Sequence, residues 1–262
     1  MLPSRVPLPA SLRAEAVGAL RRMLARVEGL EAAEPARLSF GLPALDDHLP
    51  HRGLALGALH EIAPEREDDL PAALGFLIAL LARAPTSAPL LLIQTARALA
   101  RNGGLSGHGL NTLGLDPARL ILVEAANETE ALWATEEALR SQALAAVACT
   151  LGPKLDLKIS QRLQIAARET GRPLLVLRPP AADEAATATT RWRIAATEAA
   201  RDRFGLMSRW RWHTRLTRCR NGRPGDWVLE YDHATHRFRL AAPLAHRALP
   251  ERGSPRASER AG

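Results

Sequence analysis

The sequence predicts an α/β fold: a mostly parallel sheet flanked by helices, with an antiparallel extension at its C-terminal end and a helix at its N-terminal end. Between residues 58 and 177, short apolar segments alternate with longer segments whose apolar residues recur at helical spacing. Strands that are apolar throughout are typical of parallel sheets covered on both faces. After Pro179 and Pro180, strand-like segments are joined by short turns, which predicts antiparallel pairing.

Local signals place the individual elements. Helical periodicity covers residues 70–83, 128–142 and 160–170. Asn127 and Glu130 are spaced as a capping box before the second of these helices, and Gly171 followed by Pro173 ends the third. The expected parallel strands are 58–62, 89–94, 120–124, 144–150 and 174–177. The expected antiparallel strands are 191–194, 206–219, 227–231 and 236–240.

The two ends of the chain are set apart from this core. Residues 1–37 form a first unit, in which an amphipathic helix begins near Ser11 and carries Leu20, Leu24 and Val27 on one face. This helix either packs on its own domain or is a contact element for a partner. Residues 38–242 form the main domain, and residues 243–262 form a basic tail whose composition predicts disorder.

Composition limits the classes of protein to which the chain belongs. The chain has 262 residues and a net charge of +7, and residues 185–262 contain 16 arginines against 7 acidic residues. This distribution favours a nucleic-acid or acidic protein partner, although an arginine bias that reflects codon composition is the alternative, since only Lys154 and Lys158 are lysine. We expect no membrane segment, because no uninterrupted apolar run of about 18 residues occurs. Two unrelated cysteines and no signal-peptide pattern predict a cytoplasmic protein.

The segment after the first expected strand carries the strongest functional signal. Residues 38–50 and 53–62 are similar to the entry of RecA-like ATPase domains, where a strand leads into a glycine-rich phosphate loop with lysine and a hydroxyl residue. Here the loop has no glycine, lysine or hydroxyl, and its four carboxylates would face a polyphosphate and repel it. The residues of this degenerate nucleotide loop are Pro64, Glu65, Arg66, Glu67, Asp68, Asp69, Leu70 and Pro71.

Two further positions also lack the residues that an ATPase needs. Ala96 stands where the resemblance implies a glutamate that orients the attacking water, and Cys149 stands where it implies the aspartate associated with Mg²⁺. The sequence therefore predicts a RecA-like domain that is not an enzyme and binds no nucleotide cofactor. Histidines and cysteines show no metal-ligand spacing, so we expect no metal site.

A basic aromatic strand near the C-terminus is the second candidate site. Alternation places Trp210, Trp212, Thr214 and Leu216 on one side, which we interpret as core. The other side is a candidate surface for the DNA backbone or for an acidic partner, with a solvated face as the alternative. Its residues are Arg209, Arg211, His213 and Arg215.

A second set of motifs resembles the ImuA family. These are the segments GLDPARL at 114–120 and LWATEEALR at 132–140, the run 155–168, RWRI at 191–194, and the run 212–225. Their order along the chain carries the resemblance, which covers about residues 38–241. The N-terminal helix and the tail lie outside it.

The resemblance implies a function in SOS-induced translesion DNA synthesis. ImuA-like proteins act as accessory adaptors with ImuB, a polymerase-like protein without catalysis, and with an error-prone DnaE-type polymerase. RecA and DNA are further candidate partners. The alternatives are a SulA-like inhibitor of cell division, which shares the degenerate RecA-like ancestry, and an active RecA-like ATPase.

Overall fold

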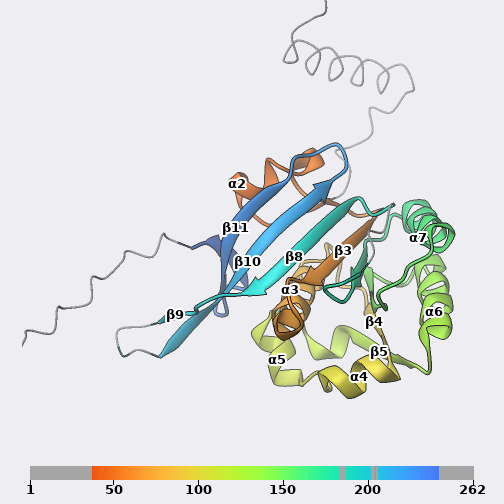
Figure 1. Cartoon of the computed structure of the whole chain (residues 1–262), viewed down its shortest axis with the longest axis horizontal. Coiled ribbons are helices and arrows are strands. Elements are labelled where there is room, and N and C mark those ends of the chain that lie inside the picture. Colours follow the sequence, from red (N-terminus) through yellow and green to blue (C-terminus); the bar gives the residue numbers. More distant parts are fainter. Residues whose placement is uncertain (1–36, 183–186, 202–203, 205, 242–262) are drawn as a thin grey trace, which may run out of the picture.

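The computed structural model describes residues 37–182, 187–201, 204 and 206–241. The expected N-terminal helix at 11–30 and the tail from 243 lie outside the described residues. A ten-stranded sheet runs through the molecule in the order β12-β11-β10-β8-β3-β7-β6-β4-β5, and β9 pairs with β10 (Figure 1). The mixed α/β architecture with a mostly parallel central sheet is confirmed.

All five expected parallel strands are present. They are β3 (Leu59–Pro64), β4 (Leu90–Thr95), β5 (Leu120–Ala125), β6 (Ala146–Thr150) and β7 (Leu174–Leu177). Of these, β5 departs from the expectation of burial on both faces, because it is the edge strand and exposes Ile121 and Leu122.

The antiparallel extension begins later than the sequence predicts. Strand β8 (Thr190–Ala196) pairs parallel with β3, so it is the last strand of the parallel part and not the first of the extension. The antiparallel strands are β9 (Ala200–Arg201), β10 (Met207–Cys219), β11 (Gly225–Asp232) and β12 (Arg237–Leu240). A separate two-stranded sheet joins β1 (Arg37–Leu38) to β2 (Leu54–Ala55).

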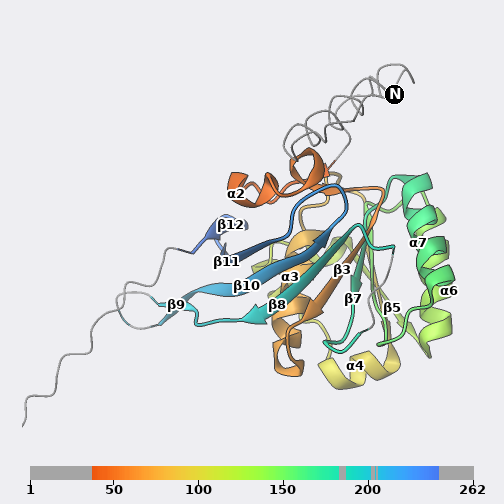
Figure 2. The same cartoon turned by 45° about the horizontal axis from the view of Figure 1, so that its top comes forward.

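Helices pack on both faces of the sheet and define two cores. One face packs against α3 (Leu70–Leu81), α5 (Gly107–Thr112) and the segment around α2 (Pro43–Asp46), with Phe40, Phe76 and Trp192 at its centre. The other face packs against α6 (Glu128–Arg140) and α7 (Leu157–Thr170) over β4, β6 and β7. Helix α4 (Ala96–Asn102) follows β4. No helix among the described elements covers the α6–α7 face of β8, β10 and β11 (Figures 1 and 2).

The predicted helix ends are confirmed in their main features. The Asn127 side chain accepts a hydrogen bond from the backbone N–H of Glu130 at the start of α6, and the Glu130 carboxylate accepts from the N–H of Ala126. Gly171 ends α7 in the left-handed conformation, with φ of 65°. In the described part of the chain, no helix combines the length and apolarity needed to cross a membrane.

A buried histidine connects β3 to its neighbours. The His60 side chain is fully buried; its Nδ1 lies 2.8 Å from Oγ1 of Thr190 and its Nε2 lies 2.8 Å from the carbonyl oxygen of Ala55. Trp192 Nε1 donates to the same Thr190 oxygen at 2.9 Å, so the hydroxyl proton is available to His60. Burial lowers the pKa of His60 from 6.5 to about 4, which keeps the ring neutral.

This pKa shift predicts a stability that depends on pH. Below pH 6.5 the unfolded chain protonates His60 while the folded chain does not, so stability falls as the pH falls from 6.5 to about 4. We expect His60 to account for a loss of about 2 kcal/mol between about pH 7.5 and about pH 5. Urea unfolding of the wild type and of His60→Gln measures this; equal pH dependence in the two proteins would contradict the assignment.

Candidate functional site

The loop from Pro64 to Pro71 joins β3 to α3 at the edge where the parallel strands end. Its backbone forms a hydrogen bond with β8, in which the N–H of Glu65 donates to the carbonyl oxygen of Ile194 at 2.8 Å. The carboxylate of Asp69 accepts from the N–H of Arg66 at 3.1 Å and from the N–H of Ala196 at 2.9 Å. The Asp69 carboxylate therefore binds one backbone N–H group of the loop and one of β8.

The acidic side chains of this loop do not all face outward. Asp69 is 2% exposed, which corrects the expectation that four carboxylates would face a ligand; its carboxylate binds backbone N–H groups instead. Glu65, Glu67 and Asp68 are exposed. Glu67 forms an ion pair with Arg101 of α4, and Glu65 forms one with Arg215 of β10 at 2.5 Å. The second ion pair joins the loop to the basic strand, so the two sites predicted from the sequence are in contact.

The two other positions singled out in the sequence carry no carboxylate at this edge. Ala96 is the first residue of α4, whose N-terminus is capped by the Thr95 hydroxyl accepting from the N–H of Ala98. Cys149 is fully buried in β6, and burial raises the pKa of its thiol to about 12. The thiol is thus protonated and closed to solvent at neutral pH.

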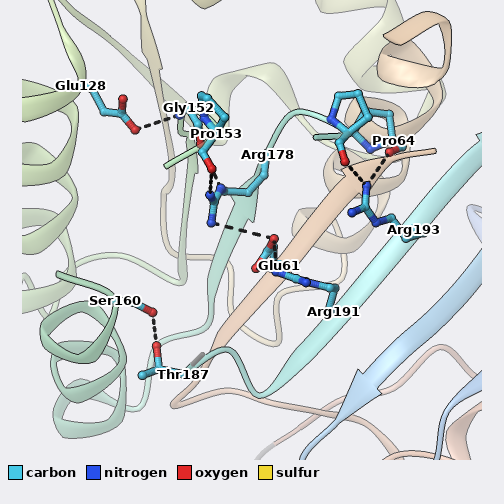
Figure 3. A network of polar contacts seen from close by, with 11 residues as sticks. Glu61, Pro64, Glu128, Gly152, Pro153, Ser160, Arg178, Thr187, Arg191 and Arg193 are labelled. Atoms are coloured by element: carbon cyan, nitrogen blue, oxygen red, sulfur yellow. Dashed lines mark hydrogen bonds and ion pairs between the residues drawn. The ribbon is translucent and has the colours of Figure 1, made fainter. Parts of the chain in front are cut away.

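A buried ion cluster that the sequence analysis does not predict lies beside the loop (Figure 3). Glu61 in β3 is in register with Arg191 in β8, whose Nη2 contacts both carboxylate oxygens at 3.0 and 3.1 Å. Arg178, after β7, places Nη1 3.9 Å from the same carboxylate. Its Nε and Nη2 donate to the carbonyl oxygens of Gly152 and Pro153 at 3.0 and 2.7 Å. The side chains of Glu61, Arg178 and Arg191 are at most 5% exposed.

Arg193 extends this connection to the loop. Its Nη1 donates to the carbonyl oxygens of Pro64 and Pro180 at 3.2 and 2.6 Å (Figure 3). The arginines of β8 therefore bind groups within the protein, and these contacts hold the ends of β3 and β7 together. A glutamate and two arginines in largely apolar strands are the sequence signal for such a cluster, but only the register shows which of them meet.

The basic strand has the orientation that its alternation predicts. Trp212, Thr214 and Leu216 are buried, and Trp210 is half-buried, so the core assignment of this side is confirmed. The four basic residues lie on the other side, and each contacts a carboxylate. The pairs are Arg209–Glu230 at 3.3 Å, Arg211–Glu230 at 2.8 Å, His213–Asp226 at 2.6 Å and Arg215–Glu65 at 2.5 Å.

These pairs change the electrostatic character of the predicted surface. Arg211 and Glu230 are nearly buried, with side chains 11% and 8% exposed, so their charges cancel in a region of reduced solvent screening. A phosphate that approached Arg209, Arg211 or Arg215 would have to compete with carboxylates already in place. Whether this face contacts DNA or an acidic partner stays a prediction.

A groove of about 910 Å³ lies next to the loop, between α3, the segment 104–113 and β10. Its lining is mainly apolar and includes Leu70, Pro71 and Trp210, and its charged lining residues are Glu67, Asp68, Arg101 and Arg211. Leu70 and Pro71 of the loop thus form part of an apolar surface.

Comparison with known proteins gives the chain a family. A scan of protein-family models finds no match. The chain is 38% identical to Protein ImuA of two strains of Caulobacter vibrioides, NA1000 / CB15N and ATCC 19089 / CIP 103742 / CB 15, over 225 residues. This alignment covers 79% of the chain and 90% of each relative. At this identity and coverage, the chain belongs to the ImuA family.

Proposed function

We propose that this chain is a non-catalytic RecA-like adaptor of the inducible mutagenesis system, acting in the cytoplasm during SOS-induced translesion DNA synthesis. Membership of the ImuA family supports a function in inducible mutagenesis. The proposed partners are an ImuB-like protein and an error-prone DnaE-type polymerase, with RecA as a further candidate. In this proposal the chain contributes binding surfaces and no chemistry.

The observation that carries the non-catalytic part is the loop from Pro64 to Pro71. A phosphate loop presents free backbone N–H groups to the phosphates. Here the Asp69 carboxylate occupies two N–H groups at this edge, and Pro71 has no N–H to offer. Glu67 and Glu65 are already paired with Arg101 and Arg215, so a polyphosphate would have to displace these carboxylates from their arginines. It would also face Asp68, and at an effective dielectric of about 20 a like-charged pair at 4 Å costs roughly 4 kcal/mol.

The partner assignment is tested by co-purification of the tagged full-length chain from cells with and without DNA damage. We expect ImuB-like and DnaE-type polymerase subunits in the damaged sample, because the proposed role is to assemble them. Untagged cells treated in the same way are the control. Enrichment of the cell-division protein FtsZ in place of the polymerase subunits would contradict the proposal and favour the SulA-like alternative.

A further inference from the structure

A basic surface lies at the end of the sheet where the parallel strands begin, opposite the end where the loop lies. We call it the N-terminal edge surface. It is formed by Arg37, the segment 47–53, the end of α7 at 168–172, and the β10–β11 turn at 218–224. These segments carry seven arginines against two carboxylates, Asp47 and Glu169, a formal excess of five positive charges. The arginines are Arg37, Arg52, Arg168, Arg172, Arg218, Arg220 and Arg223.

Direct contacts join these segments into one surface. The N–H of Arg223 donates to the carbonyl oxygen of His48 at 2.9 Å, and the His48 ring contacts the carbonyl oxygen of Pro224 at 2.8 Å. A Cβ atom at Gly53 would lie 3.2 Å from the Cβ atom of Arg37, so Arg37 adjoins the segment 47–53. A Cβ atom at Gly57 would lie 3.3 Å from the Cα atom of Arg168, so the end of α7 is adjacent. In Figures 1 and 2, α2, the β10–β11 turn and this end of α7 line the upper edge of the molecule.

The backbone holds this surface in an unusual conformation. His51 and Arg52 have φ of 57° and 58°, and Asn221 in the turn has φ of 62°. Consecutive residues other than glycine seldom adopt this left-handed conformation, and backbone strain of this kind is concentrated at binding sites. The Arg52 side chain is 62% exposed and pairs with Asp47 at 2.9 Å, and the side chains of Arg220 and Arg223 are also exposed.

The chemistry of the surface favours phosphates over a protein partner. The centre of a protein interface is rich in aromatic and apolar side chains. None of the large hydrophobic side chains exposed in the described part of the chain comes from 47–53 or 218–224. Clustered arginines without an apolar centre are typical of surfaces that bind a nucleic-acid backbone. On the β10 face, every basic residue contacts a carboxylate of Glu230, Asp226 or Glu65. In the N-terminal edge surface Arg52 pairs with Asp47 at 2.9 Å, but the segments that form this surface contain only two carboxylates for seven arginines.

We propose that the N-terminal edge surface binds the phosphate backbone of DNA without selecting a base sequence. Base stacking requires an open aromatic ring. The aromatic side chain at this edge, Trp227, is half-buried and its ring lies edge-on to His48, with the ring centres 5.0 Å apart. The surface and the loop with its groove lie at opposite edges of the sheet, so DNA leaves the loop and groove free. This inference is independent of the adaptor role, since it concerns the chain and DNA alone.

The test compares two variants of the full-length chain that lose the same charge. Arg52→Gln, Arg220→Gln and Arg223→Gln together alter the N-terminal edge surface. Arg97→Gln, Arg101→Gln and Arg140→Gln together alter exposed arginines of α4 and α6 and serve as the matched control. Fluorescence anisotropy with labelled duplexes of two unrelated sequences measures DNA affinity between about 50 and about 200 mM salt. Circular dichroism establishes that each variant is folded.

We expect the wild type and the control to bind both duplexes alike, with an affinity that falls steeply with salt. In the edge variant, the slope of log affinity against log salt should be smaller by about 2 to 3, because each lost phosphate contact contributes about 0.9. Lysine at the same three positions should restore the slope, since the positive charge returns. Equal slopes in the edge variant and the control, no binding by the wild type at low salt, or a preference for one duplex would each overturn the proposal.

Discussion

Replacing Glu61 by alanine is expected to destabilise the folded chain by roughly 3–5 kcal/mol. The Glu61 carboxylate contacts Arg191 at 3.0 Å and Arg178 at 3.9 Å, and both arginines are buried. Removing it leaves two guanidinium groups in a buried region without the negative charge that they share, and the desolvation of each remains. Urea unfolding, followed by far-ultraviolet circular dichroism, measures the change in the free energy of unfolding.

Two further variants make this result interpretable. Glu61→Gln keeps an oxygen acceptor for Arg191 and should lose less stability than Glu61→Ala. Glu65→Ala removes a carboxylate that is 39% exposed and pairs with Arg215, so its effect should be about 0–1 kcal/mol. If Glu61→Ala and Glu65→Ala were equally stable, the cluster around Glu61 would not hold the ends of the strands.

Replacing Trp212 by alanine is expected to cost roughly 3–5 kcal/mol, because it leaves a large cavity in the aromatic core. The Trp212 ring is 3% exposed and lies 5.9 Å from the ring of Phe76, 5.7 Å from Tyr231 and 6.0 Å from Phe238. The loss should appear as a lower urea midpoint with an unchanged slope.

The matched control is Trp133→Ala, since Trp133 lies on α6 and is 64% exposed. Its effect on stability should be within about 0.5 kcal/mol of zero. A Trp212→Ala protein that kept wild-type stability but lost affinity for single-stranded DNA would show that this ring stacks on bases and is not part of the core.

The fold could be predicted where a local pattern determines it. Apolar strands separated by amphipathic helices identified the parallel part. The position of β8 was missed because Trp192 and Ile194 alternate with Arg191 and Arg193, as in a half-exposed antiparallel strand. In the structure, Arg191 is buried against Glu61 and Arg193 donates to two carbonyl oxygens. Both arginines therefore have partners within the protein, and β8 can lie inside the sheet although its sequence alternates. The exposure of β5 was missed because an apolar run does not reveal an edge.

The candidate sites were predictable as segments but not as contacts. The segment from Pro64 to Pro71 runs from the last residue of β3 into the first turn of α3, and the sequence predicts this junction of strand and helix. The hydrogen bond between the buried Asp69 carboxylate and the N–H of Ala196 joins residues that are 127 positions apart in the sequence. The carboxylates that neutralise the arginine face come from β11 and from the loop, and their positions depend on a strand register that composition does not encode.

Titration calorimetry with Mg-ATP tests the central claim, that this ImuA-family chain works through its surfaces without nucleotide chemistry. The loop has no lysine, presents exposed carboxylates and uses Asp69 to bind its own backbone. We therefore predict a flat titration for the full-length chain and no release of phosphate in the same samples. An affinity in the micromolar range, or hydrolysis above the buffer control, would contradict the account.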